Sequence, residues 1–438
     1  MKELSVIIPA YNVENYIENC LQCLLSQLRE NWEIICIDDG SQDNTYAILT
    51  DYAKRNKNLR IIRNEKNSGA ARSRNTGLEA AEGEYVIFLD SDDLFDSNFL
   101  WKMYDRARNC DADMVVCQHM ILKYDAMGQK REEPVEYTNW EMLPADTLSK
   151  KDCFPLLYFM VEFIPWNKLV KRKVLKENHI YFQNLPNSND VCYSILATTY
   201  SDKICFLKEH LIFYRENREN SLSSGRMEKR NYTIYAFEHV FKELEERGLY
   251  TGLIKACLVN FVIYWTYNFY NQCTAELYKT ILRDIHERLG KYLIKENVQD
   301  ILYSDWCYYQ YRCVQGKEIR DGNVYLIMRE AVISLLQKNR EKRIALWGAG
   351  KMGRRFIGLL EDNANYICSI IDNDSMKQGN ELNGIPIISY EESVGKTDMV
   401  ILLNRRYKKE ILQQIGTAYA VLDFWQYAQF GFVPSLEK

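Results

Sequence analysis

The first 120 residues alternate between short apolar runs, which are typical of buried strands, and longer segments with apolar residues at helical spacing. This alternation predicts an α/β fold with a mostly parallel sheet covered by helices. Ligands bind such sheets at the carboxyl ends of the strands, so the residues after each strand are the candidates for function. The predicted strands are 5–8, 33–37, 59–62 and a run that ends at Asp90, and the predicted helices are 17–28, 43–54, 68–81 and 98–108.

The pattern changes twice further along the chain. Residues 121–225 are less regular and contain the basic stretch "NKLVKRKVLK". Residues 226–335 are helical in pattern and rich in Tyr, Phe and Leu, which we interpret as core rather than membrane surface because no basic polar face accompanies them. After the charged stretch "LQKNREKR", a second strand–helix–strand pattern runs to the end. The predicted parts are 1–225, 226–335 and 341–438.

Composition narrows the class of protein. The 438 residues are 47% hydrophobic and 26% charged, which is typical of a folded chain. The formal net charge of −4 gives no basic field, so nucleic acid is not an expected partner. There is no charged leader before an apolar signal core and no apolar run of membrane-spanning length, so we expect a cytoplasmic protein, with peripheral membrane contact left open.

The 13 cysteines are scattered through the chain. Cys20 and Cys23 form a Cys-x-x-Cys pair, which is a spacing used by zinc sites. The pair lies inside a helical pattern and on its apolar side, with no second pair at zinc-site spacing. We therefore interpret both as reduced core residues rather than metal ligands.

Three of the strand ends offer groups that suit a nucleotide. Strand one is followed by a turn with an aromatic ring and an amide, where a base could lie. Strand two ends in a pair of carboxylates, which can accept from a nucleobase N–H, and Gly40 allows a close turn. "NSGAARSRN" places a glycine, an arginine and an amide at a helix N-terminus, which suits phosphate. The candidates are Pro9, Ala10, Tyr11, Asn12, Asp38, Asp39, Gly69, Arg72 and Asn75.

The fourth strand runs into the acidic stretch "VIFLDSDDLFD". Asp90 and Asp92 are one residue apart, so in an extended chain both side chains point the same way and can share a divalent ion. Oxygen ligands favour Mg²⁺ or Mn²⁺, and a diphosphate would complete the shell. The alternative is a solvated turn in which Asp92 or Asp93 caps the next helix.

Together, "SVIIPAYNVENYIENCLQCLLSQ", "EIICIDDGSQDNT", "NSGAARSRNTGLEAAEGEYVIFLDSDD" and "PWNKLVKRKVL" resemble the successive motifs of the inverting family 2 nucleotide-sugar glycosyltransferases, which have the GT-A fold. The resemblance covers residues 1 to about 225. It implies that Asp39 contacts the uracil and that Arg72 lies near the nucleotide phosphates. It also implies that Asp90, Ser91 and Asp92 form the Asp-x-Asp motif, which holds a metal on the donor diphosphate.

The same resemblance implies a catalytic base. Inverting transfer needs a group that takes the proton of the acceptor hydroxyl. Family members carry Glu-Asp before a helix, and here the matching residues are Asn189 and Asp190, so Asp190 is the expected base and the Glu is replaced. The alternative for Asp190 is a helix cap, and Asp202 is the next carboxylate to consider. Further residues that the resemblance places near the donor or acceptor are Trp166, Tyr214, Arg215 and Arg218.

The C-terminal segment carries a second nucleotide-like motif. Gly348, Gly350 and Gly353 follow a predicted strand, and Asp372 ends the next one at a distance that suits a ribose contact. Gly350 is expected to be required for the tight turn. The segment resembles small Rossmann-like α/β domains of the nucleotide-binding kind that are attached to sugar-modifying enzymes, and an accessory or oligomerisation role is the equal alternative.

The sequence thus predicts a metal-dependent inverting glycosyltransferase that uses Mn²⁺ or Mg²⁺ and moves a sugar from a UDP-sugar to a hydroxyl of a cell-surface polysaccharide or lipid-linked glycan. The resemblance alone supplies the acceptor class. One alternative is an NAD-dependent oxidoreductase built on the C-terminal segment. Another is a catalytically degenerate protein that binds sugar nucleotides, because of Asn189. Homo-oligomerisation is left open.

Overall fold

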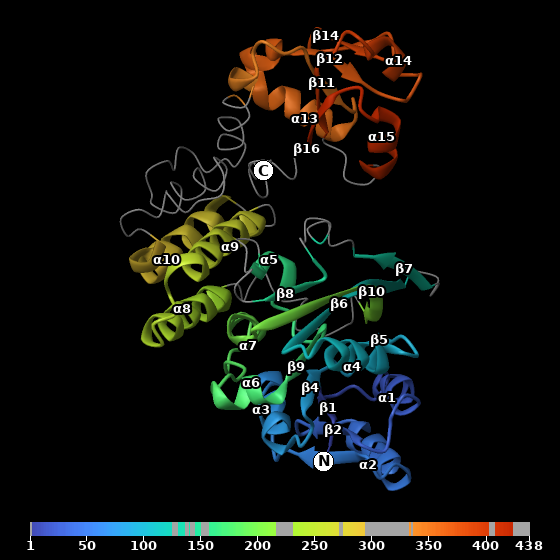
Figure 1. The fold of residues 1–438 in the computed structure, drawn as a ribbon, viewed down its shortest axis with the longest axis vertical. Coiled ribbons are helices and arrows are strands. Elements are labelled where there is room, and N and C mark those ends of the chain that lie inside the picture. Colours follow the sequence, from blue (N-terminus) through green and yellow to red (C-terminus); the bar gives the residue numbers. More distant parts are fainter. Residues whose placement is uncertain are drawn as a thin grey trace. The chain divides into compact units, whose positions relative to one another are not determined.

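The structure is a computed structural model that describes residues 2–124, 130–135, 140, 145–149, 157–215, 231–270, 275–293, 333, 336–402 and 408–423. Its contacts divide the chain into two compact units, Met1–Phe261 and Val262–Lys438 (Figure 1). Each unit has its own sheet and is described by itself.

The described strands of the first unit form one mixed sheet in the order β3-β2-β1-β4-β9-β6-β10-β5, with β7 beside β6 and β8 beside β10. β1 to β4 are parallel, β9 runs antiparallel to both β4 and β6, and β6 is parallel to β10. The bounds are β1 Leu4–Ala10, β2 Trp32–Asp38, β3 Leu59–Arg63, β4 Tyr85–Phe88, β5 Leu94–Phe95, β6 Met114–Tyr124, β7 Lys130–Pro134, β8 Thr147–Ser149, β9 Lys168–Lys171 and β10 Lys203–Arg215.

Helices pack on this sheet through apolar stripes. α1 buries Ile17, Cys20, Leu21 and Leu24, which recur at helical spacing. Cys20 is fully buried in the main core cluster and Cys23 packs against it, which confirms the core interpretation of this pair. The helices that follow the first strands are α1 Ile17–Leu25, α2 Thr45–Arg55, α3 Ala70–Ala80 and α4 Phe99–Cys110.

Gly77 sets how closely α3 approaches the sheet. A Cβ on this residue would lie 2.3 Å from Cγ2 of Ile7 on β1, so only glycine fits without a shift of the core. The close approach holds the first turns of α3 against the strands that carry the predicted site.

The predicted strands and helices of the first 120 residues are confirmed, with ends that differ by a few residues. β5 and β9 are two of the strands that were not predicted. β5 forms inside the acidic stretch, where Leu94 and Phe95 pair with Phe213 and Ile212 of β10. β9 lies in the basic stretch, whose charges did not indicate a strand. In the structure Lys168 is buried and the strand is inserted between β4 and β6. The hypothesis that Asp92 or Asp93 caps α4 is wrong, since α4 begins at Phe99 after β5 and has Asn98 at its N-cap.

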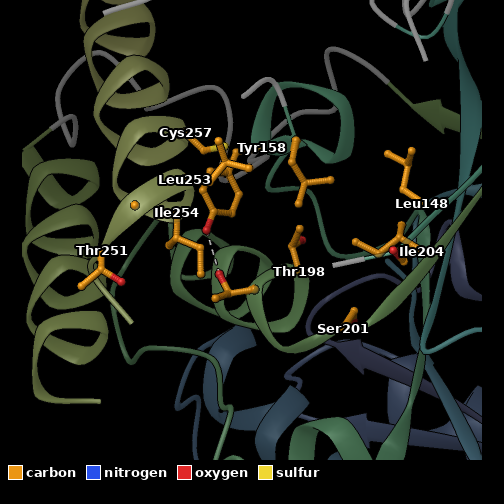
Figure 2. A pocket seen from close by; sticks show the side chains of 13 residues that line it. Leu148, Tyr158, Thr198, Ser201, Ile204, Thr251, Leu253, Ile254 and Cys257 are labelled. Atoms are coloured by element: carbon orange, nitrogen blue, oxygen red, sulfur yellow. Dashed lines mark hydrogen bonds between the residues drawn. The ribbon is translucent and has the colours of Figure 1, made fainter. Parts of the chain in front are cut away.

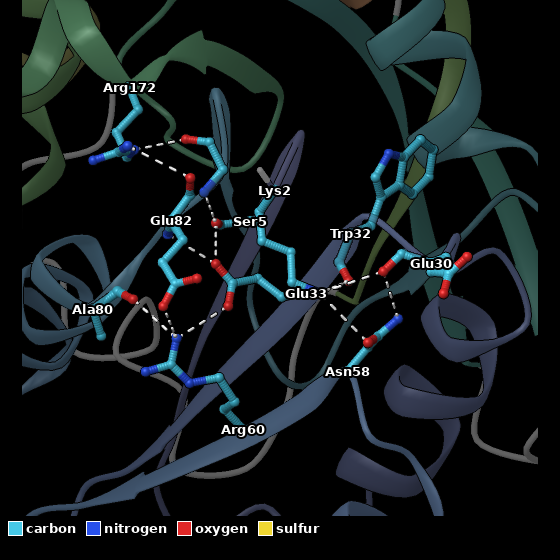
Figure 3. A network of polar contacts seen from close by, with 11 residues as sticks. Lys2, Ser5, Glu30, Trp32, Glu33, Asn58, Arg60, Ala80, Glu82 and Arg172 are labelled. Carbon is cyan, nitrogen blue, oxygen red and sulfur yellow. Dashed lines mark hydrogen bonds and ion pairs between the residues drawn. The ribbon is translucent and has the colours of Figure 1, made fainter.

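A polar network joins the amino ends of β1, β2 and β3 (Figure 3). Glu33 Oε1 accepts from Ser5 Oγ at 2.7 Å and from the Glu82 backbone N–H at 2.8 Å, and its Oε2 accepts from Arg60 Nη1 at 3.1 Å. Ser5 Oγ in turn accepts from the Gly83 N–H at 2.8 Å. The buried carboxylate is thus fully paired and ties three strands to the loop before β4.

The remaining helices of the first unit surround α7, whose first residue is Asp190. α8 packs against α7, and Arg247 after α8 donates to the Asn178 carbonyl at 2.6 Å. Within the described part of the chain, no helix is long and apolar enough to cross a membrane. The bounds are α5 Leu157–Val161, α6 Arg172–Glu177, α7 Asp190–Tyr200, α8 Asn231–Glu246 and α9 Gly252–Tyr270, the last of which extends past the boundary at Phe261.

The second unit contains α10 (Ala275–Leu293) and a sheet in the order β13-β14-β12-β11-β15-β16, which is parallel except for the β13–β14 pair. Two apolar clusters cover it. The bounds are β11 Ile344–Trp347, α13 Lys351–Leu360, a 3₁₀ helix at Glu361–Tyr366, β12 Ile367–Ile371, β13 Glu381–Leu382, β14 Ile385–Ile388, α14 Tyr390–Ser393, β15 Met399–Leu402, α15 Lys408–Ile415 and β16 Ala420–Asp423.

Candidate active site

The carboxyl ends of β1, β2 and β4 bring the predicted residues together. Asp39 follows β2 and is buried, and its backbone N–H donates to the Ala10 carbonyl at 2.8 Å. Its carboxylate accepts from Asn64 Nδ2 at 2.7 Å and from the Ser68 and Gly69 N–H groups at 3.0 and 2.7 Å. Asp39 therefore fixes the loop that precedes α3. Gly40, with φ of +73°, lets the chain turn against the Lys66 backbone as predicted.

The acidic stretch after β4 is held by two arginines. Arg74 Nη2 donates to Asp90 Oδ1 at 2.7 Å. Arg215, at the end of β10, donates its backbone N–H to Asp93 Oδ1 at 2.9 Å and its Nε to the Asp92 carbonyl at 3.0 Å. These contacts come from α3 and β10, which are far from the stretch in sequence, so tertiary structure fixes the shape of this turn.

The carboxylates of this turn repel one another. Asp93 is buried, and burial, followed by the charges of Asp92 and Asp90, raises its pKa well above the usual range of an aspartate. Asp93 Oδ2 has no hydrogen-bond partner among the described residues. Crowded, incompletely compensated carboxylates fit a divalent cation. The described residues contain no cluster of three or more His, Cys, Asp or Glu side chains arranged for a metal ion.

Asp190 is the first residue of α7, and Asn189 is the N-cap. Asn189 Oδ1 accepts from Arg74 Nη1 at 3.1 Å, so Arg74 contacts both Asp90 and the residue before Asp190. Lys168 is buried, and desolvation lowers its pKa to about 7, while the charges of Glu162 and Asp190 oppose that shift. Asp202 follows the last turn of α7, about 16 Å of helix from Asp190. Its prediction as a neighbouring alternative base is therefore wrong.

Other predicted residues lie in different surroundings. Arg72 is exposed on α3. The Asn75 amide donates to the Phe182 carbonyl and accepts from its N–H, both at 2.8 Å, so it holds the chain before α7. Trp166 is buried and stacks on Tyr214, with ring centroids 5.6 Å apart. Arg218 lies outside the described residues.

The turn after β1 is an accessible part of the predicted site. Tyr11 is 39% exposed, whereas Ala10 is buried and Pro9 is partly buried. Asn12 adopts a left-handed conformation, with φ of 50°, and its Oδ1 accepts from the Gln42 N–H at 2.9 Å. Tyr11 thus presents an aromatic side chain beside the carboxyl end of β2.

Two residues at this edge, Arg74 and Asp93, were not among the predicted site residues. Arg74 is 7% exposed although it is an arginine, and its position could have been found from the helical stripe Ala71, Arg74 and Leu78, all buried. A charged residue on the buried stripe of a helix is rare without a partner. No sequence pattern indicated that Asp93 is buried, because its burial depends on contact with β10.

A separate cavity of ≈290 Å³ lies among β8, α5, α7, β10 and α9 (Figure 2). Three hydroxyls on its wall already donate to helix carbonyls: Thr198 to Ser194, Thr199 to Ile195 and Ser201 to Ala197. None of the described residues that line it carries a carboxylate, imidazole or ammonium group. It is an apolar space near the end of α7 opposite Asp190 and lacks the chemistry of a transfer site.

In the second unit, Gly348 and Gly353 are the glycines that the turn requires. Gly348 has φ of +107°, and a Cβ on Gly353 would lie 2.0 Å from the Gly348 carbonyl oxygen. Gly350 has open space, so the expectation that it shapes the turn is wrong. The buried Asp372 carboxylate accepts from the Ala349 N–H at 2.7 Å and the Asp374 N–H at 2.9 Å, and Lys377 lies 3.4 Å away. Asp372 thus pins the glycine turn to β12.

Comparison with known proteins agrees with this geometry. The sequence profile of the family described as "Glycosyl transferase family 2" matches residues 5–178, and that of "C2185-like, N-terminal" matches residues 340–420. The chain is 30% identical over 219 residues to "Glycosyltransferase GlyG" of Streptococcus pneumoniae. The match covers 49% of this chain and 71% of that protein.

A second relative is "Poly(ribitol-phosphate) beta-glucosyltransferase" of Bacillus spizizenii, with 30% identity over 221 residues, 50% of this chain and 33% of that protein. The chain thus spans only a third of that relative's length. Among solved structures, "S. aureus TarS 1-349 in complex with UDP-GlcNAc" matches with a TM-score of 0.57 and 22% identity, covering 73% of this chain and 95% of that chain. This match shows a shared fold, which is GT-A-like α/β. With the family profile over residues 5–178 and the extent of the match to GlyG, the chain belongs to glycosyl transferase family 2 and is a glycosyltransferase.

Proposed function

We propose that the chain transfers a sugar from a UDP-sugar to a hydroxyl of a cell-wall or cell-surface polysaccharide. The observation that carries the proposal is the joint placement of Asp39, Asp90, Asp92 and Asp190 around one edge of the sheet, with Arg74 in contact with Asp90 and Asn189. Support for the donor comes from the fold shared with a protein solved with UDP-GlcNAc. Support for the acceptor comes from the name of the poly(ribitol-phosphate) relative.

A divalent cation, Mn²⁺ or Mg²⁺, would be held by Asp90 and Asp92. Mg²⁺ sites of this kind use one or two carboxylates and are completed by substrate phosphates. Asp90 is partly exposed and gives one oxygen to Arg74. When bound, the ion would offset the charge that develops on the departing diphosphate. The chain's own part is to fix the carboxylates, which Arg74 and Arg215 do from two directions.

Asp190 is the base in this proposal. The acceptor oxygen attacks the anomeric carbon of the donor, and its proton moves to the Asp190 carboxylate. The bond between the anomeric carbon and the diphosphate oxygen breaks, and UDP leaves with the electron pair. A single displacement of this kind inverts the configuration at the anomeric carbon. Position at the first turn of α7 favours the ionised carboxylate, because the helix dipole stabilises negative charge there.

The test is a donor screen with the purified full chain, Mn²⁺ and a panel of UDP-, GDP- and dTDP-sugars. We expect saturable binding by calorimetry and slow hydrolysis for a UDP-sugar, and loss of both in excess EDTA. The same panel without metal and with free UDP is the control. Full activity in EDTA would refute the metal requirement. If UDP-sugars bind but are neither hydrolysed nor transferred to polysaccharide, the result would favour a degenerate binding protein.

A further inference from the structure

Arg74 occupies an unusual place for a cation. It is buried on α3, with its guanidinium carbon 5.2 Å from the centroid of the Phe182 ring. One terminal nitrogen donates to Asp90 at 2.7 Å and the other to Asn189 at 3.1 Å. Its partners lie 16 and 115 residues away in sequence. A planar guanidinium with both arms engaged fixes the separation of the two groups that it joins.

The two partners belong to the two halves of the reaction. Asp90 follows β4 and would hold the metal in the proposed function, whereas Asn189 is the N-cap of the helix that begins with Asp190, the proposed base. The next residue of α3, Asn75, clamps the Phe182 backbone with two hydrogen bonds. Consecutive residues of one helix therefore hold the approach to α7 at two points.

Asn189 suits this contact by its own chemistry. Its Oδ1 accepts from Arg74, while its Nδ2 donates to the Leu185 carbonyl at 3.4 Å, a bond that a carboxylate could not make. The neutral amide also leaves the charge of Arg74 to be balanced by Asp90. Asn189 thus holds the loop before α7 through both atoms of its side-chain amide.

We propose that Arg74 is a positioning residue that, through Asp90 and Asn189, sets the distance between the metal-binding carboxylates and the base Asp190. This inference rests on the proposed function. It makes Asn189 part of a competent site, which departs from the interpretation of that residue as a mark of degeneracy. A bridge of this kind acts on the geometry of transfer, and a misplacement of about 1 Å costs roughly 10²-fold in rate.

The test is a double-mutant cycle with Arg74→Gln, Asn189→Ala and the double variant, assayed for transfer with a UDP-sugar and Mn²⁺. We expect Asn189→Ala to lower kcat with little change in donor KM, because Asn189 contacts Arg74 and the loop before α7 but not Asp90. Arg74→Gln should change both, since it also loosens Asp90, with a loss of transfer of roughly 10²-fold. The double variant should be no slower than Arg74→Gln alone, because Asn189 acts through Arg74.

The matched control is Glu79→Gln on the same helix. Glu79 ties α3 to Lys176 at 2.5 Å and to Tyr181 at 2.7 Å, close to the same segment, but touches neither Asp90 nor Asn189. It should keep normal kcat and KM at temperatures where all variants stay folded. Equal losses in this control, or independent losses that multiply in the double variant, would overturn the bridge.

Failure of the proposed function gives a different result. If the wild type transfers no sugar from any UDP donor, the proposed function is wrong. The same four proteins then test the contact through urea unfolding, where additive changes in unfolding free energy would refute a coupled Arg74–Asn189 pair.

Discussion

The strands β1, β2 and β3 carry polar groups at both ends, and the two ends differ in how completely those groups are paired. At the amino ends, both oxygens of Glu33 accept hydrogen bonds from three donors (Figure 3). At the carboxyl edge, Asp39 also accepts from three donors, but Asp38 Oδ1 and Asp93 Oδ2 are buried with no hydrogen-bond partner among the described residues. Buried polar groups are normally satisfied, so we expect the amino end to serve stability and the unpaired oxygens of the carboxyl edge to mark the proposed ligand site.

The second unit shows the opposite use of a carboxyl end. Asp372 follows β12, yet its oxygens accept from the chain's own N–H groups. In its pairing it resembles Glu33 and differs from Asp90. An acidic residue after a strand is thus insufficient to identify a ligand site, because the chain's own donors can already satisfy its carboxylate.

The largest effect that separates the two ends is expected for Asp190→Asn. The amide keeps the shape of the carboxylate but cannot take a proton, and loss of a positioned base costs about 10²- to 10⁴-fold in rate. Donor affinity should change little, because Asp190 is assigned to the acceptor side. One transfer assay and one UDP-sugar titration test this. Near-normal transfer would remove Asp190 from the base role.

Asp92→Asn should fail in the reverse order, with weaker binding of Mn²⁺ and donor first and lost turnover as the consequence. Changes even in residues that support a metal ligand cost roughly 10- to 100-fold in affinity, and loss of a ligand should cost at least as much. Calorimetry of UDP with and without Mn²⁺ measures it. Unchanged Mn²⁺-dependent affinity would show that Asp92 is not a ligand.

At the amino end, Glu33→Ala should affect stability and not transfer. It strands the Ser5 hydroxyl and the Glu82 N–H, and hydrogen bonds to charged groups contribute about 1.5–3 kcal/mol. Urea unfolding followed by Trp fluorescence gives the change, with Arg60→Ala as a control. That control should cost less, because Arg60 is half-exposed. A fall in kcat of the folded Glu33 variant would break the distinction between the ends.

The smallest effect is expected for Asp93→Asn, which should raise the stability of the fold where Glu33→Ala lowers it. Because its pKa is raised on folding, the folded state binds more protons than the unfolded state, and stability falls as pH rises above the ordinary value of about 4. The amide removes that pH dependence and can still accept from the Arg215 N–H. Unfolding should therefore need slightly more urea at pH 7 and show less change between pH 4 and 7. If the Asp93→Asn variant is less stable than the wild type at pH 7, the prediction is contradicted. Asp51→Asn on the surface is the control.

Much of the first unit was decided by local sequence. Apolar runs and helical spacing predicted β1 to β4 and α1 to α4, because each pattern must bury one face and only one secondary structure does so. The same patterns located Asp39, Asp90 and Asp92, since parallel strands with helical connections bring their carboxyl ends to one edge. These features depend on neighbours close in sequence.

Tertiary structure decided the rest. β9 lies between β4 and β6 although its sequence is basic, because these two strands, which come much earlier in the chain, pair with it on both sides. The same holds for Arg74, whose charge is balanced by a carboxylate 16 residues away and whose second arm reaches a loop 115 residues away. A charge can be buried only where its partner arrives. The sequence thus determined which strand ends carry acidic groups, and the packing of distant elements decided which of those acids find hydrogen-bond donors within the fold and which do not.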